Sequence, residues 1–447
     1  MKKNTYILTE GNIKMHLIKL AVPLLIGNIF QQFYNLVDTI IVGKYIGENA
    51  FAALGVAGTI MNLFIFLLGG CCTGISVILS TFYGKQDMKE YRKESFLALT
   101  FGLGFTVFLS FLSIVLLPSI LRLINTPLEL EEYVSQYLII IFLGLFITFL
   151  YNLFASQLRS MGNTRFALIF LIIAIICNIF FDFVFIKYFH FGTRGAAWAT
   201  VISQGISAVL CFAYIKTNFA ECIVTKKDMI FDKILLKKTL YFASISALHQ
   251  SSLYIGKILV QGAVNTLGTF GIAAYTATNR VEGIANTFAV SGTEVISVFL
   301  AQNIGAGNKK RALEGFKTSF ILMHTLGIIM SLFLYFGAES LMRFLLENAN
   351  TETVKNGVDY LQTIAYFYIL CFTGSTFVGY FRGSGIMNLP FIGTTLQIII
   401  RVVLSYAFIS SLQLGGVAAA TGLGWIAISC FHAFFFFRTK KRIFKKG

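Results

Sequence analysis

The chain has 447 residues, of which 56% are hydrophobic and 13% are charged, and its mean hydropathy is +0.76. So few charged residues cannot cover the surface of a water-soluble protein of this length, and the apolar content excludes an intrinsically disordered or collagen-like chain. The net charge of +16 would favour nucleic-acid binding in a soluble protein, but here the cations lie in short runs between apolar stretches. The composition therefore predicts an all-α integral membrane protein without a nucleic-acid partner.

Twelve segments are long and apolar enough to span a bilayer, which takes about 20 residues each. The first follows the N-terminal MKKN but lacks a small-residue cleavage site, so we interpret it as a retained helix and not as a signal peptide. The segments are 17–43, 51–82, 95–121, 133–158, 166–188, 195–215, 239–266, 271–302, 313–337, 358–381, 391–411 and 415–437.

The distribution of Lys and Arg predicts the orientation. With the N-terminus in the cytoplasm, 27 of the 36 cations fall in the inner segments or the span ends beside them, six fall in the outer loops or the span ends beside them, and three lie deep within spans. Cytoplasmic loops carry the excess of Lys and Arg in membrane proteins. We therefore expect a multi-pass protein of the cell (inner or plasma) membrane with both termini in the cytoplasm.

The sequence also repeats itself. One constant shift aligns ISVILSTFYGKQDMK (75–89) with ISVFLAQNIGAGNKK (296–310), and a slightly larger shift aligns RSMG (159–162) with RGSG (382–385). This predicts two pseudo-symmetric six-helix bundles with a central cavity, an arrangement typical of alternating-access transporters. The predicted parts are an N-terminal half (1–215), a basic cytoplasmic linker (216–238) and a C-terminal half (239–447).

The first segment carries polar residues on one face. Asn28, Gln31, Asn35 and Asp38 follow at steps of three, four and three residues, which places them on one side of a helix. A carboxylate inside a membrane costs about 2.5–3.5 kcal/mol. Because an amide would join helices at lower cost, we interpret Asp38 as functional, while the amides either line a cavity or join helices. Pro23 earlier in the segment allows it to bend.

A second acid lies in the same half. Asp182 follows Asn178 by four residues in the fifth segment, so both lie on one helix face. Asn152 in the fourth segment and Thr200 in the sixth add neutral oxygen atoms. Together with Asp38, these groups can hold a hard cation such as Na⁺ or exchange protons.

The second half differs. Leu259 stands at the position matching Asp38, and Arg401 falls near the region matching Asn178. Lys257, Arg280 and Glu282 lie at similar estimated depth, which favours an internal ion pair.

Glu294 is the remaining acid of interest in the second half. It matches Thr73 of the first half, and we treat it as a candidate cavity-facing residue. Cofactor motifs are missing from the sequence: it contains no Walker A sequence and no CxxC, and its five His form no HxxxH.

Several strings, taken in order over nearly the whole chain, resemble the MATE (multidrug and toxic compound extrusion) family. They are PLLIGNIFQQFYNLVDT (23–39), YGKQD (83–87), RSMGNTR (159–165), NIFFD (178–182), GAAWAT (195–200) and AQNIGAGNKKRA (301–312).

The resemblance implies secondary antiport: export of cationic or amphipathic small molecules in exchange for H⁺ or Na⁺, with no other cofactor. It implies a cation or proton site made of Asp38, Asn178, Asp182 and Thr200. Gln31, Asn35, Asn152 and Glu294 are then candidates for the substrate cavity, and Glu294 stands where MepA-like members have a functional acid. The regions that carry acids in NorM-like members read ALHQSSLY (247–254) and ILCFTGST (369–376) here, without an acid. The chain therefore resembles the DinF- and MepA-like branch more closely, and we expect a functional monomer.

Three alternatives remain at this stage. A flippase for a lipid-linked precursor would need several cations for a pyrophosphate, and the spans offer only Lys257, Arg280 and Arg401. An integral membrane lipid-modifying enzyme would need clustered His, Asp or Ser near an interface, which the sequence does not show. A channel would more often be an oligomer of smaller subunits.

Overall fold

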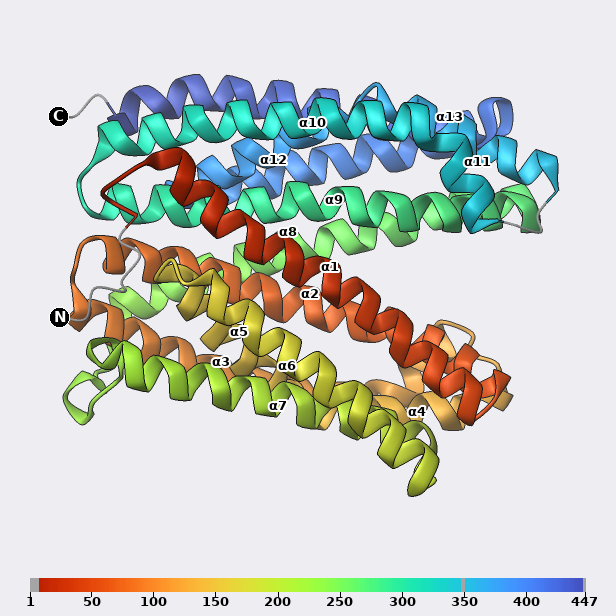
Figure 1. The fold of residues 1–447 in the computed structure, drawn as a ribbon, viewed down its shortest axis with the longest axis horizontal. Coiled ribbons are helices and arrows are strands. Elements are labelled where there is room, and N and C mark those ends of the chain that lie inside the picture. The colour runs from red at the N-terminus through yellow and green to blue at the C-terminus, as the bar shows by residue number, and fades with distance from the viewer. Residues whose placement is uncertain (1–7, 347–349, 445–447) are drawn as a thin grey trace. The chain divides into compact units, whose positions relative to one another are not determined.

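The computed structural model describes residues 8–346 and 350–444, apart from the side chains of 34–36 and 444. Within these ranges the chain forms helices and no strand, as the composition predicts. The first half comprises α1 (Ile13–Tyr45), α2 (Glu48–Gly84), α3 (Met88–Leu123), α4 (Leu128–Leu143), α5 (Leu145–Ser160), α6 (Thr164–Asp182), the π-helix η1 (Phe183–Tyr188) and α7 (Gly192–Asn218) (Figure 1).

Two short 3₁₀ turns, η2 (Ala220–Cys222) and η3 (Lys226–Asp228), lead into the second half. That half comprises α8 (Lys233–Val264), the 3₁₀ turn η4 (Asn265–Leu267), α9 (Gly268–Gly305), α10 (Lys309–Leu345), α11 (Thr351–Ala365), α12 (Tyr368–Gly383) and α13 (Asn388–Phe444).

Length and hydropathy alone mark eight helical segments of the described chain as able to cross a membrane, or up to ten when bent pairs count as one span each. Two of the eight are far too long for one crossing: Lys233–Gly305 has 73 residues and Asn388–Ile443 has 56, against the roughly 20 that a bilayer needs. The first contains α8 and α9, and α13 is broken at Gln413, whose φ is 49°. When each bent pair counts as one span and both long segments are divided in two, the described chain has the twelve predicted spans.

The internal repeat is present in the backbone. Left-handed residues, which interrupt or end helices, occur in both halves at matching positions. The pairs are Gly47 with Gly268, Gln86 with Gly307, Gly162 with Gly385, and His190 with Gln413. The first two pairs have the spacing that aligns 75–89 with 296–310, and the last two have the spacing that aligns 159–162 with 382–385. The break in α13 therefore corresponds to the end of η1 in the first half.

Two predicted spans are bent pairs of helices, which the sequence analysis did not predict. α4 and α5 meet at 50°, and α11 and α12 meet at 52°. The first bend lies at Gly144, where an added Cβ would collide with the Val201 side chain of α7. A larger residue would not allow this close approach, so the bend depends on glycine.

Each half has the same pattern of helix neighbours. In the first, α2 contacts α3, α4 and α5, and α7 contacts α4, α5 and α6. In the second, α9 contacts α10, α11 and α12, and α13, which contains the parts matching α6 and α7, contacts α11 and α12.

The chain forms two compact units whose boundaries fall inside helices. The described residues of the first unit are Val22–Ala247, and the second contains Leu8–Ala21 and the chain from Leu248. The start of α1 therefore belongs to the second unit, and the start of α8 belongs to the first. The predicted linker 216–238 lies within the first unit.

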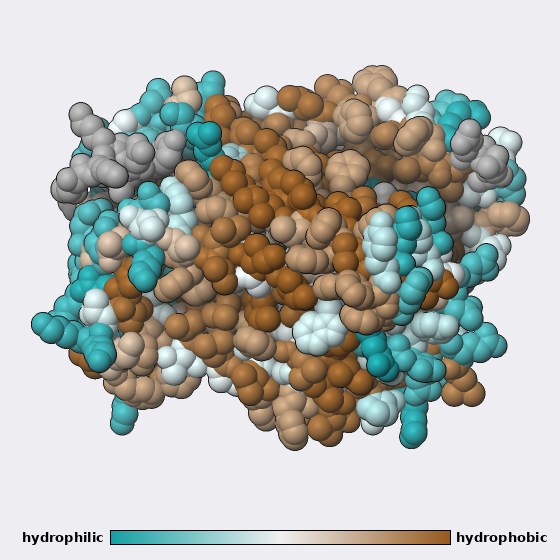
Figure 2. Space-filling view, turned by 60° about the horizontal axis from the view of Figure 1, so that its bottom comes forward, coloured by the Kyte–Doolittle hydropathy of each residue, from teal (hydrophilic) through white to brown (hydrophobic). Residues whose placement is uncertain are grey.

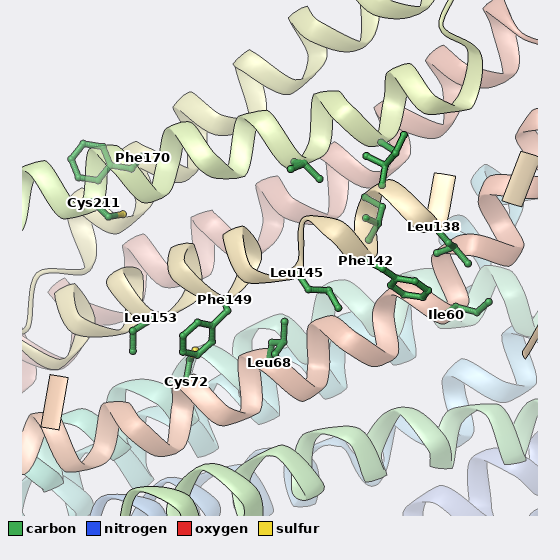
Figure 3. Packing of buried hydrophobic residues seen from close by; sticks show 14 of the residues in the cluster. Ile60, Leu68, Cys72, Leu138, Phe142, Leu145, Phe149, Leu153, Phe170 and Cys211 are labelled. Carbon is green, nitrogen blue, oxygen red and sulfur yellow. The ribbon is translucent and has the colours of Figure 1, made fainter. Parts of the chain in front are cut away.

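The core of the first unit is built mainly from side chains of α2, α3, α4, α5, α6 and α7. Leu68 and Cys72 of α2 face Leu145 and Phe149 of α5 (Figure 3). Hydrophobic side chains gain little by leaving lipid for protein, so this core is held mainly by close van der Waals packing.

Glycines allow the closest contacts between helices. A Cβ added at Gly70 of α2 would lie 2.7 Å from the Ser246 carbonyl oxygen and 2.7 Å from the Ala247 Cα, both in α8. Gly383 of α12 approaches α9 in the same way, 2.7 Å from the Ser297 carbonyl oxygen. Both glycines belong to a GxxxG sequence, GCCTG (70–74) and GYFRG (379–383), a motif that joins membrane helices. Sequence analysis overlooked both.

The surface fits a membrane-spanning protein. On the face shown in Figure 2, hydrophobic residues cover the central part and hydrophilic residues gather toward two of its edges. On α3, for example, Val107, Phe108, Phe111 and Val115 are each more than half exposed. An apolar surface of this kind would not remain in water.

Candidate functional site

Two predicted acids lie together in the first unit. Asp38 of α1 and Asp182 at the end of α6 are both buried, and their carboxyl groups lie close enough to interact. Two ionised carboxylates this close repel each other strongly away from water, which favours a proton or a cation beside them. The pair can therefore take up a proton or a cation.

Asn178 and Thr200 complete the cluster. In the orientation that satisfies both of its polar atoms, the Asn178 amide donates from Nδ2 to Asp182 Oδ2 at 3.1 Å and accepts from the Thr200 backbone N–H at 3.2 Å. Both residues are buried. The structure thus brings together the four residues predicted for the ion site, from α1, α6 and α7.

The backbone at the site is irregular. Asp182 is the last residue of α6, and the chain continues as the π-helix η1 from Phe183. π-Helical segments disturb the regular hydrogen-bond ladder and are frequent at functional sites. Asp182 therefore lies at a position where the helix can change its winding.

The cluster has unused acceptor capacity. Asp38 Oδ1 and Asp182 Oδ1 are buried and lack a hydrogen-bond partner. Such oxygens can accept a proton or coordinate a hard cation, whose preferred ligands are oxygens. Among the described residues there is no group of three or more His, Cys, Asp or Glu side chains that could hold a metal ion. That the site serves H⁺ or Na⁺ stays a prediction.

The predicted cavity residues lie elsewhere. Gln31 is exposed on α1, and the side chain of Asn35 lies outside the described residues. Asn152 is half-buried on α5, and its Nδ2 donates to the Thr148 carbonyl oxygen of its own helix at 2.8 Å. None of these observations tests whether these residues line a substrate cavity, which stays a prediction.

Glu294 belongs to a polar network in the second unit. It is half-buried on α9 and attracts Arg382, which is buried in the last turn of α12. Arg382 Nη2 donates to His249 Nδ1 at 2.6 Å, and His249 Nε2 contacts Thr394 Oγ1 at 2.9 Å. A guanidinium only donates, so Nδ1 is the acceptor and the ring hydrogen is on Nε2. Arg382, one of the 27 cations counted on the inner side, is thus a buried helix residue and not a loop residue.

A second polar cluster in the same unit surrounds Glu282. Its Oε2 accepts from the Tyr360 hydroxyl at 2.8 Å, and Arg401 and Lys257 lie close enough to attract it. Arg401 Nη2 donates to the Tyr275 hydroxyl at 3.4 Å. Arg280 is exposed on α9. Glu282 thus lies near Arg401 and Lys257, and the predicted internal ion pair stays a prediction.

Some buried polar contacts were missed from the sequence. Thr148 Oγ1 donates to Gln204 Oε1 at 2.5 Å, joining α5 to α7. Gln204 follows Thr200 by four residues, so helical spacing could have placed it on the same face. His249 and Arg382 are 133 residues apart, and no local pattern signals their contact.

Comparison with known proteins supports the sequence resemblance. The family model MatE matches the chain twice, over residues 23–184 and 246–407. The offset between the two matches is the one that aligns RSMG with RGSG, so the family model finds the same internal repeat. Together the matches cover more than half of the chain.

Relatives and solved structures agree with this match. A Bacillus subtilis protein named "Probable multidrug resistance protein YpnP" is 28% identical over 97% of this chain and 96% of its own length. A crystal structure of MATE in the bent conformation superposes with a TM-score of 0.92 at 22% identity, covering 100% of this chain and 99% of that one. An outward-facing multidrug resistance MATE transporter gives 0.91 at 21% identity, covering 99% of each chain.

Proposed function

The chain belongs to the MatE family, and from this we propose that it exports cationic or amphipathic small molecules as a cation-coupled antiporter using H⁺ or Na⁺. Like the multidrug resistance proteins that it resembles, it is a multi-pass membrane transporter and not an enzyme. Alternating access between its two repeats would move the substrate. The placement in the DinF- and MepA-like branch stays a prediction.

The observation that carries the proposal is the pair Asp38 and Asp182, two buried acids that lie close together inside the first unit. Such a pair can gain a proton or bind a cation, because two adjacent carboxylates repel each other strongly away from water. Uptake of the coupling ion then neutralises the site. Its release restores the negative charge, and that change can favour one conformation over the other.

The experiment is transport in proteoliposomes with the H⁺ and Na⁺ gradients imposed separately. Asp38→Asn and Asp182→Asn should each abolish uphill export of ethidium, because an amide keeps the shape but cannot titrate or supply charge. Glu94→Gln is the matched control, since Glu94 is a buried acid of the same unit outside the site. Uphill export by either Asp variant would contradict the assignment.

The membrane topology and the oligomeric state are part of the same proposal. We propose that both termini face the cytoplasm in the cell membrane, because 27 of 36 cations lie on that side in the predicted topology. We also propose that the protein works as a monomer. Labelling of single cysteines introduced into the loops tests the orientation.

A lipid-linked precursor flippase is the second candidate. The observation in its favour is that Arg401 and Lys257 approach each other in the second unit and give that cluster a net positive charge around Glu282. A pyrophosphate would be attracted there. Translocation of a labelled lipid carrier, lost in Arg401→Gln but kept in Asp38→Asn, would favour the flippase over the exporter.

A further inference from the structure

The segment between α7 and α8 is fixed to the surface of α3. Arg92 of α3 donates from Nε to Asp228 Oδ2 at 2.8 Å and from Nη1 to the Glu221 carbonyl oxygen at 2.9 Å. The same Asp228 oxygen accepts from the Thr225 backbone N–H and hydroxyl. Thr239 Oγ1 donates to Glu94 Oε2 at 2.7 Å further along. The segment therefore has a defined face against the protein and a defined outer face.

The outer face is strongly apolar. Met229, Ile230 and Phe231 are about half exposed, at 54%, 49% and 56%, and Ile234 is 86% exposed. The neighbouring Leu235 and Leu236 are buried against the protein. Four large hydrophobic side chains within six residues would be costly on a surface that faces water.

Lysines surround these side chains. Lys226, Lys227, Lys233 and Lys237 are exposed. Lys238 is different, because its Nζ lies over the rings of Phe82 and Phe242. An apolar surface bordered by four exposed lysines has the composition of a segment lying in the interface of an anionic membrane.

The place where the segment packs along α3 also fits a location in the membrane interface. The Phe231 ring packs on Phe101 of α3, with 5.5 Å between ring centroids. Phe101 is eight residues beyond Lys93, or about 12 Å along the helix. Beyond it α3 exposes Phe105 and Phe108, so the apolar surface of the segment continues into the lipid-facing surface of this spanning helix.

We propose that Met229, Ile230, Phe231 and Ile234 enter the boundary between headgroups and acyl chains of an anionic phospholipid leaflet, while Lys226, Lys227, Lys233 and Lys237 bind lipid phosphates. These eight residues form the interfacial patch. Its partner is the bilayer that the protein spans, so the patch anchors the connection between the two halves to the lipid. The proposal does not depend on which substrate is transported.

The first test measures depth in the membrane. In a Trp198→Phe, Trp425→Phe background, Ile230→Trp provides a single fluorophore in the full-length protein reconstituted into vesicles containing phosphatidylglycerol. Lipids brominated at the shallow acyl positions should quench it about threefold more than they quench a Lys310→Trp control, and its emission should be shifted to the blue. Emission typical of water, with quenching equal to the control, would overturn the proposal and leave the patch to a soluble protein partner.

The second test measures lipid preference. Replacing Lys226, Lys227, Lys233 and Lys237 with Gln should lower the phosphatidylglycerol retained by the purified protein, relative to phosphatidylcholine, by about twofold or more in native mass spectrometry. The control replaces four other exposed lysines, Lys85, Lys89, Lys310 and Lys317, with Gln. An equal fall in both variants, or no fall in the first, would overturn the assignment of the phosphate-binding lysines. All eight positions are exposed, so folding should be preserved, and gel filtration checks this.

Discussion

The contact between α2 and α8 gives a prediction that does not depend on the substrate. An alanine at Gly70 would place its Cβ 2.7 Å from the Ser246 carbonyl oxygen and 2.7 Å from the Ala247 Cα. Ordinary contacts begin at 3.4 Å. The opposing atoms belong to the backbone of a helix, so no side chain can rotate away. We therefore expect the two helices to separate by roughly 1 Å at this point.

Overpacking of this kind costs about 1–3 kcal/mol. The better helix propensity of alanine, about 1 kcal/mol relative to glycine, offsets part of it. Gly69 is the matched control, because it is the neighbouring residue on α2 and nothing lies within 4 Å of an added Cβ. Gly69→Ala gains the propensity term alone, so the difference between the two variants isolates the steric term.

The assay is thermal unfolding of the purified protein in detergent, followed by the reaction of its buried cysteines with a thiol-reactive dye. A domain of 150–250 residues loses about 2–4 °C per kcal/mol, so Gly70→Ala should unfold roughly 2–12 °C below Gly69→Ala. Gly70→Leu should lower the folded yield further, while Gly69→Leu should not. Equal transition temperatures for the two alanine variants would refute the close packing of α2 on α8.

Three further predictions concern charge and motion. The Arg92 guanidinium lowers the pKa of Asp228 from 3.8 to about 2, so the stabilisation that it provides is present above about pH 4 and is lost only as the pH falls toward 2. Asp228→Asn should therefore raise amide hydrogen exchange in 219–228 at pH 7, whereas the wild type should stay protected down to about pH 4; unchanged exchange would contradict this role. Glu294→Gln should weaken export of cations more than export of neutral compounds, and equal losses would point to a structural role beside Arg382. Pro23→Ala should reduce turnover more than substrate affinity, because α1 loses a point of easy bending; turnover equal to the wild type would make α1 a rigid wall.

Much of the fold could be predicted because its signals are local. Each span is a continuous apolar stretch, and the repeat is visible in strings such as ISVILSTFYGKQDMK. Helix starts are equally local: Asp87 and Asn308, which match each other in the repeat, both cap helices by accepting a backbone N–H three residues later. The bends in the fourth and tenth spans were not predicted, because they depend on contacts such as that of Gly144 with Val201 of another helix.

The polar residues of the two units also differ in whether the sequence alone could predict them. A carboxylate in an apolar stretch is costly wherever it occurs, so Asp38 and Asp182 could be selected without knowing the fold. Their contact could be proposed only because both lie in one half. The network of His249 with Arg382 and Thr394 was overlooked, because none of its members is unusual beside its neighbours in the sequence. Only the packing of α8, α12 and α13 brings them together.

The two halves share a backbone but differ in their buried chemistry. Left-handed residues occupy matching positions because each half must end and restart its helices at the same places to fold. Buried polar residues are under no such constraint. Leu259 replaces Asp38, and the same alignment places His249 at the position of Asn28. Since each charge in a membrane costs several kcal/mol, roughly 2.5–3.5 for Asp or Arg, charges are expected to remain only where they are compensated or used. The acid pair of the first unit has unpartnered oxygens, whereas Glu282 and Glu294 each lie beside a cation. This difference supports the proposal that ion coupling belongs to the first half, and it is why Asp38→Asn and Asp182→Asn are the decisive variants.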